Sequence, residues 1–439
     1  SDATKSAQNL GNLNFLIEFI LMLGFNINIL SVLLFIFIFF ILKSILVFIN
    51  DYYAIIVKLN FSKKIRIESI DGLQRMSYKS FVAADVGQIQ NTITGEVEKI
   101  IKAYDSYYVT MQQGIMILVY MSFAIFVDIQ FAVLVSVGGL LTNFVYKKIF
   151  SLTKKASYQL TKDSNFFQGL IIQFVTNFKY LKSTGLLTKY GGKIFEGVDV
   201  LNTINKKIGY FAVIIKATRE PLIISIVISV IYLETTLFKT SLGPIIISLL
   251  FFYRALNSFM ALQSAWNSFL SVSGSLVNMT EFNNWLYSNR EVTGKKEFFR
   301  FNKKIQLINA SFHYGSIQIL KDISLEIAKN ETVAFVGESG SGKTTLVSLI
   351  SGLMPLETGE LKIDGVNRNE LEINSFQKRV GYITQEPVIF NDTIFNNVSF
   401  WAEQTQENKK RFESAILKAS VFDFVNTLDE RENTLLGNN

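Results

Sequence analysis

The feature of this sequence that most restricts its fold is a set of long apolar runs before residue 280. The clearest is "ILSVLLFIFIFFILKSILVFIN", residues 29–50, in which Lys43 is the one charge. Four more runs follow, at 114–127, 131–146, 221–238 and 242–262. A membrane-spanning helix needs about 20 predominantly apolar residues, and fewer where flanking residues reach the interface. A soluble protein can bury one such run, but five of them predict a membrane domain.

Composition supports this class and excludes others. Hydrophobic residues make up 49% of the 439 residues and charged residues 18%, whereas soluble proteins average about 25% charged. The sequence has no Cys, which excludes disulfides and Cys-ligated metals, and its one His, at 313, leaves too few groups for a zinc site or a serine-type triad. The length allows two or three domains.

The loops between the runs predict the orientation. Residues 51–111 and 147–220 are long, polar and helical in pattern, while the breaks near 128 and 240 are short. Between Lys147 and Lys207 there are eleven Lys against three acidic residues, an excess that the positive-inside rule assigns to the cytoplasm rather than to nucleic acid. Five spans would then leave the N-terminus outside, and a missing first helix would restore an even number. The run at 15–25 is too short to span, so we expect it to be interfacial or part of a helix leading into the membrane.

After residue 280 the pattern changes from apolar helices to strands and turns. We expect domains at 1–280 and 304–439, separated by a polar linker at 281–303. The expected strands are "KIQLINASFHY", "ISLEIA", "ETVAFVG", "GELKIDGV" and "KRVGYITQ", with helices in "TTLVSLISGLM" and "NKKRFESAILKASVFDFVNTL". A strand followed by a Gly-rich loop and a helix predicts an α/β nucleotide-binding domain.

That Gly-rich loop lies in "FVGESGSGKTTL", residues 335–346. Residues 337–344 fit G-x-x-x-x-G-K-[ST] at every fixed position. Its glycines let consecutive N–H groups face phosphate oxygens, and the following helix adds the positive end of its dipole. Lys343 would contact the β- and γ-phosphates, and the Thr344 hydroxyl would ligate Mg²⁺. The cofactors predicted are therefore ATP and Mg²⁺, with phosphate contacts from Gly337, Ser339, Gly340, Ser341, Gly342, Lys343 and Thr344.

The stretch from "ASFHYG" through "GESGSGKTTL" to "GELKIDGV" resembles the first half of an ATP-binding-cassette (ABC) domain. The five spans and two long loops before it resemble the membrane domain of an exporter-type half-transporter, which in that family has six helices. Within the family, "FYRALNSFMALQSAWNSF" and "NTITGEVEKI" are more similar to flippases of lipid-linked oligosaccharides than to peptide or drug exporters. The expected fold is an all-α membrane domain with five of six helices, followed by an incomplete α/β P-loop domain.

The resemblance implies further site residues. Tyr314 matches the aromatic that stacks on adenine, although a strand Tyr taken alone is more often a packing residue. Gln385 matches the glutamine that senses the γ-phosphate and Mg²⁺ and joins the two halves of the cassette, which gives it catalytic and metal-binding roles. Thr345 would add a hydroxyl near the α-phosphate. His313 matches no functional position and is expected on the surface.

In the membrane domain, the resemblance implies coupling helices around residues 81–87 and 177–183, which transmit motion to the cassettes; the alternative is two solvated bends. Arg254 lies inside an apolar span, where an ionisable group is costly and often functional. A substrate contact and a snorkelling or helix-pairing role both remain open for it.

Several family motifs are not present in the sequence. It contains no L-S-G-G-Q signature, no apolar strand ending in Asp-Glu, and no His after the phosphate loop. We expect truncation at both ends, so that this chain alone binds nucleotide weakly and does not hydrolyse it. The complete protein is expected to be an ATP-driven exporter or flippase of amphipathic substrates. It would work with a second half-transporter in a membrane, by family a bacterial inner membrane, with the nucleotide-binding domain cytoplasmic. The alternatives are a membrane-tethered P-loop kinase or GTPase, and an ABC-type regulator or channel that uses ATP as a switch.

Overall fold

The computed structural model describes residues 29–127, 129–236, 242–385 and 387–437. The chain divides into two compact units, Ser1–Glu291 and Val292–Asn439, and each is described by itself. The apolar run at 15–25 lies outside the described residues.

The described part of unit 1 is helical. Its elements are α3 (Ile29–Gln74), α4 (Tyr78–Val82), α5 (Val86–Asn91), the π-helical turn η2 (Thr92–Glu96), α6 (Val97–Val127), α7 (Ile129–Thr176), α8 (Phe178–Ser183), α9 (Leu187–Thr236), α10 (Leu242–Ser271) and α11 (Ser273–Ser288). At 1.5 Å per residue, the 48 residues of α7 extend about 70 Å, more than twice the roughly 30 Å of a bilayer's hydrocarbon core. The expected long helices, apolar in one part and polar in the other, are therefore confirmed.

The five apolar runs lie on α3, α6, α7, α9 and α10, apart from residues 237–238, which the structure does not describe. Two stretches of the described residues, Ile29–Gln74 and Val86–Phe126, are long and apolar enough to cross a membrane on the criteria of length and hydropathy. Side chains such as Phe37 and Phe48 on α3 are 63% and 70% exposed. So much exposed apolar surface in one helix requires lipid or protein to cover it.

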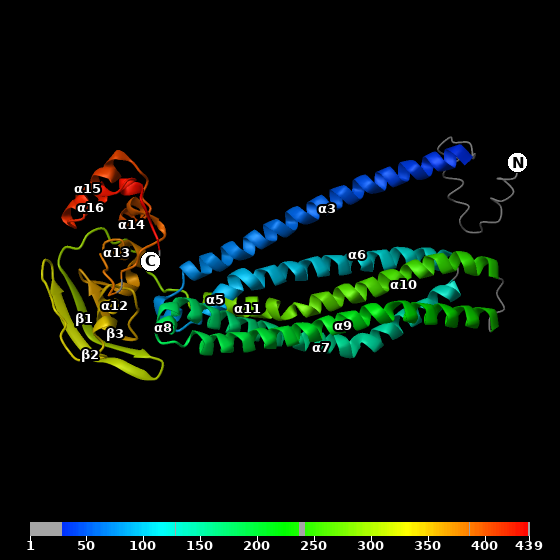
Figure 1. Ribbon diagram of the computed structural model, residues 1–439, viewed down its shortest axis with the longest axis horizontal. Helices are drawn as coiled ribbons and strands as arrows, with labels where there is room; N and C mark the ends of the chain where they lie inside the picture. The colour runs from blue at the N-terminus through cyan, green and yellow to red at the C-terminus, as the bar shows by residue number, and fades with distance from the viewer. Residues whose placement is uncertain (1–28, 128, 237–241, 386, 438–439) are drawn as a thin grey trace. The chain divides into compact units, whose positions relative to one another are not determined.

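Helices α6, α7, α9 and α10 lie side by side, whereas α3 diverges from α6 toward its N-terminal end (Figure 1). The two helices meet at their polar ends, where Lys58 Nζ lies 2.6 Å from Asp105 Oδ2 and Tyr108 donates to Asn50 over 2.9 Å. The main apolar core of unit 1 lies among α7, α9 and α10. It contains Tyr146, Phe150, Ile215, Ile223, Val230, Phe252, Leu256, Met260 and Leu270.

A buried polar network joins α5, η2 and α6 to α7 and α11. Glu96 is fully buried, and its Oε1 accepts from Lys99 at 2.7 Å and from Asn91 at 3.2 Å. Asn91 also donates to Asn165 of α7, which donates to Asn278 of α11. The π-helical turn brings this acid inward from within "NTITGEVEKI", a feature that apolar periodicity does not reveal.

Unit 2 contains a four-stranded antiparallel sheet of order β2-β1-β3-β4 and a smaller helical part. Its elements are β1 (Lys304–Tyr314), β2 (Ile317–Ala328), α12 (Lys343–Ile350), β3 (Thr358–Ile363), β4 (Val366–Asn367), η3 (Arg368–Glu370), α13 (Ile373–Gln377), β5 (Asp392–Thr393), α14 (Ile394–Ser399), α15 (Gln406–Lys418), α16 (Phe422–Thr427), η4 (Arg431–Asn433) and β6 (Leu435–Leu436). β1 and β2, which include the expected strands at 304–314 and 323–328, pair antiparallel, with Leu307 opposite Leu325.

Within the expected strand "GELKIDGV", Asp364 and Gly365 form a turn between β3 and β4. Its φ angles are +51° and +87°, which match a two-residue hairpin turn with both central residues left-handed. The Asp364 carboxylate also accepts three hydrogen bonds, from the backbone N–H groups of Asn302, Lys303 and Lys304 at 2.7–3.0 Å. It thereby fixes the start of β1.

Two expected strands are wrong. Residues 331–337 and 378–385 form no strand, and the side chains of Val336 and Ile383 are 95% and 97% exposed. Their apolar composition suits a buried strand, but a strand also needs neighbours for its N–H and C=O groups. The four-stranded sheet of the described residues does not provide them.

Other expectations are refined. The first eight residues of the expected linker, 281–288, continue α11, with Phe282 and Leu286 buried. The C-terminal helical stretch is two helices, α15 and α16, because Ser420 adopts a left-handed φ of +58° between them. Short helices occur where coupling helices are expected: α4 and α5 flank residues 83–85, and α8 covers 178–183.

The close packing of α11 on α7 at Gly274 can be tested by substitution. The Gly274 N–H donates to Ser157 Oγ at 2.9 Å, and a Cβ there would lie 2.5 Å from the Ser157 carbonyl oxygen. We expect Gly274→Val to destabilise unit 1 by about 3 kcal/mol or more, since backbone must move to admit it. Gly192→Ala is the control, because nothing lies within 4 Å of its Cβ and alanine favours a helix by about 0.5–1 kcal/mol. Thermal unfolding in detergent measures both, and equal midpoints would contradict the packing argument.

Candidate functional site

The phosphate loop connects residue 336 to the start of α12. The Ser341 N–H donates to the Glu338 carbonyl at 3.2 Å, which closes a turn. Gly340 and Gly342 have φ angles of +83° and +89°, a region that side chains disfavour. A Cβ on Gly342 would also lie 2.9 Å from Leu320 Cδ2 of β2. The loop therefore requires glycine at 342 for both backbone conformation and space.

Lys343 is folded over this loop. Its Nζ donates to the carbonyl oxygens of Gly337 and Glu338 at 2.8 and 2.7 Å and lies 3.4 Å from Ser341 Oγ. The ammonium group thus stands among the residues expected to surround phosphate, and phosphate oxygens bound there would replace the carbonyl oxygens as its partners.

The other predicted phosphate ligands are close by. Ser339, Gly340, Ser341 and Thr344 are exposed, and Thr345 is half-buried. The Thr344 carbonyl accepts a hydrogen bond from Ser348 Oγ within α12. Thr344 is the second residue of this helix, so its hydroxyl lies at the first turn. A P-loop can use these groups to hold a nucleotide's phosphates and Mg²⁺.

Tyr314 lies at the end of β1 and packs inward. Its hydroxyl lies 3.3 Å from Met354 Sδ, and its ring meets Phe312 edge-on with centroids 5.0 Å apart. It borders the cluster of Phe312, Leu320, Leu349 and Met354, beside the helix that follows the phosphate loop. The packing role that a strand tyrosine has by default is present, and stacking on adenine stays a prediction. His313 is half-buried, and its Nδ1 lies 2.8 Å from Glu357 Oε2.

Gln385 is exposed and lies outside the helices and strands of unit 2. Among the described residues, no hydrogen bond joins it to the phosphate loop, so its metal-sensing role stays a prediction. Sequence reasoning missed Leu320 and Ile319, which lie within 3.1 Å of a Cβ at Gly342 and fix the loop from β2. No local signal marks them, because they are ordinary strand residues.

Arg254 is exposed on α10, between the buried Phe252 and Ala255. Nearby on the same helix, Asn257 accepts two hydrogen bonds from Arg219 of α9, each 3.1 Å. The exposure of Arg254 is compatible with both expected roles, a substrate contact and a snorkelling or helix-pairing side chain.

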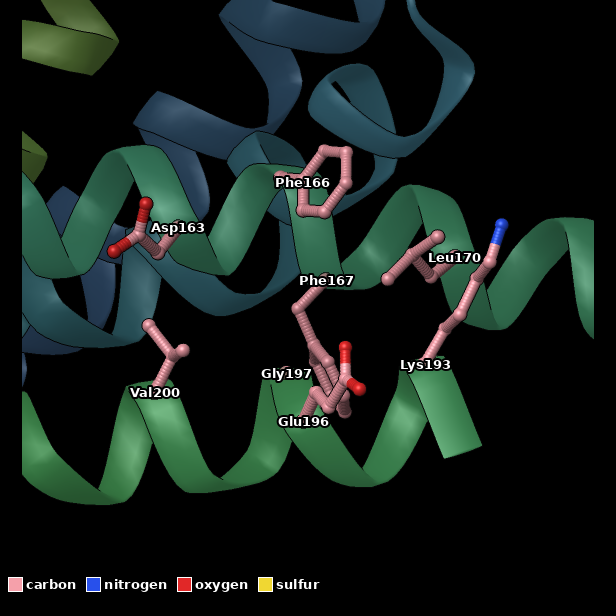
Figure 2. Close-up of a pocket in the computed structure, with 8 residues that line it drawn as sticks. All are labelled: Asp163, Phe166, Phe167, Leu170, Lys193, Glu196, Gly197 and Val200. Atoms are coloured by element: carbon pink, nitrogen blue, oxygen red, sulfur yellow. The ribbon is translucent and has the colours of Figure 1, made fainter. Parts of the chain in front are cut away.

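A separate hollow of about 440 Å³ lies between α7 and α9. Figure 2 shows Phe167 of α7 reaching down to Gly197 of α9. A Cβ on Gly197 would lie 2.8 Å from the Phe167 ring. Asp163, Glu196 and Lys193 supply the charges at its edge. None of the predicted nucleotide-site residues lines this hollow.

Comparison with known proteins relates these features to a family. The family model described as "ABC transporter" matches residues 320–436. An ATP-dependent lipid A-core flippase of Francisella tularensis subsp. tularensis is 25% identical over 91% of this chain and 66% of its own length. A flippase of the same description from Syntrophus aciditrophicus is 37% identical, over 32% of this chain and 23% of its own. The structure of a bacterial Atm1-family ABC exporter with ATP bound matches with a TM-score of 0.74 at 16% identity, over 87% of this chain and 68% of that one.

Residues 320–436 therefore form a domain of the ABC transporter family. A helical membrane domain of exporter fold and an ABC nucleotide-binding domain are fused in one polypeptide. The chain spans 66% of the length of the Francisella flippase.

Asp392, in the "VIFNDTIFNNV" phrase after Gln385, allows a test of pH dependence. Hydrogen bonds from Asn396, the Thr393 N–H and Trp401 lower the pKa of its carboxyl group. A depressed folded-state pKa contributes stability above the unfolded pKa of about 3.9, and this is lost as pH falls through the folded value.

We therefore expect Asp392→Asn to lower the unfolding temperature of unit 2 at pH 7 and to flatten its decline between about pH 5 and 3. Asp423→Asn, which changes an exposed aspartate of α16, is the matched control. Thermal unfolding across this pH range is the measurement. An unchanged acid slope in the Asp392 variant would contradict the assignment.

Proposed function

We propose that this chain is the subunit of an ATP-driven exporter or flippase that works as a dimer of half-transporters. The observation that carries the proposal is the phosphate loop of residues 337–344, set on an ABC domain in the same chain as long apolar helices. Several relatives matched over 91% of the chain are described as lipid A-core flippases. An amphipathic, lipid-linked substrate follows from that similarity.

In this proposal the loop's own geometry fits a nucleotide. Gly340 and Gly342 adopt the left-handed conformations that the loop needs. Lys343 and Thr344 supply a cation and a hydroxyl at the start of α12. Bound ATP supplies the free energy for transport, with Mg²⁺ neutralising charge on its phosphates. Tyr314 would position the base, Thr345 would contact the α-phosphate and Gln385 would sense the γ-phosphate and metal.

Hydrolysis is proposed only for the assembled transporter. Orienting water and stabilising the transferred phosphoryl group need more groups than the phosphate loop, and the sequence contains no L-S-G-G-Q and no Asp-Glu strand. In the complete protein, each phosphate loop would face the signature of a partner half-transporter, and α4–α5 and α8 would couple the cassettes to the membrane helices. The proposed location is a bacterial inner membrane with unit 2 in the cytoplasm. No observation on this chain favours the regulator or channel alternative.

Nucleotide binding tests the core of the proposal. We expect Lys343→Ala to weaken binding of a fluorescent ATP analogue at least about tenfold, because a charge-assisted contact to phosphate is lost. The fold should be unaffected, since Lys343 contacts only exposed loop atoms. Lys329→Ala, at an exposed lysine after β2, should bind as the wild type does. Equal affinity in both variants would refute a phosphate-binding role for this loop.

A further inference from the structure

Seven exposed lysines lie on α7 and α9. They are Lys147, Lys148, Lys154 and Lys155 of α7 and Lys206, Lys207 and Lys216 of α9, and we call them the basic belt. All seven are exposed. The core-facing side of α7 holds other residues, including the buried Tyr146, Phe150, Thr153, Ser157 and Thr161. The belt therefore faces away from the packed core of unit 1.

Two lysine-rich stretches carry the belt, and Asp163 and Asp199 border them. Residues 147–162 contain five lysines and no carboxylate, and residues 200–219 contain three lysines, Arg219 and no carboxylate. Glu220 follows directly and offsets one charge. Arg219 is excluded from the belt because it donates to Asn257.

A lysine-rich helix surface is often simply solvated. Some cations on or next to α3 and α6 have acidic partners, as in Lys58–Asp105, Arg75–Asp71 and Lys99–Glu96. Within the part of the chain that the structure describes, no belt lysine forms an ion pair; Lys154 lies 5.9 Å from the centre of the Tyr158 ring. The belt is thus an excess of positive charge without internal compensation.

The belt begins at the ends of the two apolar runs, 131–146 on α7 and 221–238 on α9, although exposed apolar side chains such as Val213 of α9 occur within it. A hydrogen bond of 2.7 Å between Tyr146 and Thr218 sets α7 against α9 and places Lys147 and Lys148 at the level of Lys216. On the other side of this level, α7 exposes Leu140 and Phe144 by 66% and 78%. On α9, Ile224 and Ile228 are likewise exposed.

The distance of each belt lysine along α7 or α9 from the end of the apolar run determines whether it can reach the lipid headgroups. The headgroup layer of one leaflet is about 6 Å thick, so Lys147, Lys148 and Lys216 would lie within it. Lys154 and Lys155 follow seven residues later on the same face, about 10 Å further, which is close to the Debye length of roughly 8–10 Å. Lys206 and Lys207 lie about 15 Å from Lys216 along α9 and contribute less.

We infer that the basic belt binds the anionic headgroups of the membrane leaflet at this end of the spans. Uncompensated lysines at the edge of a lipid-facing apolar surface attract acidic phospholipids in particular. The inference rests on the proposed membrane orientation. It adds a lipid class and a contact surface that nucleotide binding does not require.

Lipid binding to the whole chain tests the inference. Native mass spectrometry in detergent would compare phosphatidylglycerol with phosphatidylcholine bound to the wild type. It would also compare a belt variant (Lys147→Gln, Lys148→Gln, Lys154→Gln, Lys216→Gln) with a distal control (Lys179→Gln, Lys182→Gln, Lys189→Gln, Lys193→Gln). The control removes the same number of exposed charges, and its nearest lysine on α9, Lys193, is about 35 Å from Lys216.

The wild type and the distal control should prefer phosphatidylglycerol at least about tenfold, and the belt variant should lose that preference. Raising the salt concentration to about 0.5 M should reduce the preference, and replacing the four belt lysines by arginine should retain it. The inference is overturned if the wild type shows no preference, if the belt variant keeps it, or if both glutamine variants lose it equally. Displacement of the lipid by soluble glycerol phosphate at similar concentration would also overturn it, because the surface would then bind phosphate and not a membrane.

The outcome is separable from that of the proposed function, since the assay contains no nucleotide. Circular dichroism and gel filtration of each variant show whether it is folded. A belt variant that fails to fold is replaced by Lys147→Gln with Lys148→Gln alone, for which at least half of the preference should be lost.

Discussion

The need to satisfy backbone polar groups in hydrocarbon determines the form of unit 1. Lipid offers no partner for N–H or C=O groups, so a spanning segment has to bond within itself, as a continuous helix does. This explains why runs as apolar as residues 29–50 form helices although their side chains are exposed in the isolated chain. Long helices then carry the fold beyond the membrane, and there polar contacts such as Lys58–Asp105 and the Glu96 network take over the packing.

The phosphate loop depends on a different constraint, the backbone freedom of two glycines. Gly340 and Gly342 adopt left-handed conformations, which lets the loop turn tightly into α12. β2 of the β1–β2 hairpin contacts the loop at Gly342, because Leu320 and Ile319 fill the space that a side chain at 342 would occupy. The shape of the loop therefore depends on residues that lie close together in sequence, from Ile319 and Leu320 to Gly342.

The sequence predicts those parts of the fold that depend on local pattern. The apolar runs, the pairing of β1 with β2, the Asp364-Gly365 turn and the position of α12 all follow from spacing and residue type. It fails at residues 331–337 and 378–385, because an apolar segment becomes a strand only when neighbours bond to it. It also does not reveal the π-helical turn that buries Glu96, nor that Tyr314 packs against Met354. Both depend on contacts between residues far apart in sequence.

The two failed strands clarify how the site is held. In a P-loop domain the strand before the loop is expected to anchor it, yet here residues 331–337 are unpaired and Val336 is 95% exposed. The loop nevertheless has its glycine conformations, its Ser341–Glu338 turn and its folded Lys343. Its anchors in this chain are instead the packing of α12 through Leu349 and the contact of Gly342 with β2. The shape of the phosphate loop is therefore set by the helix and hairpin beside it, and pairing of the preceding strand is not required to form it.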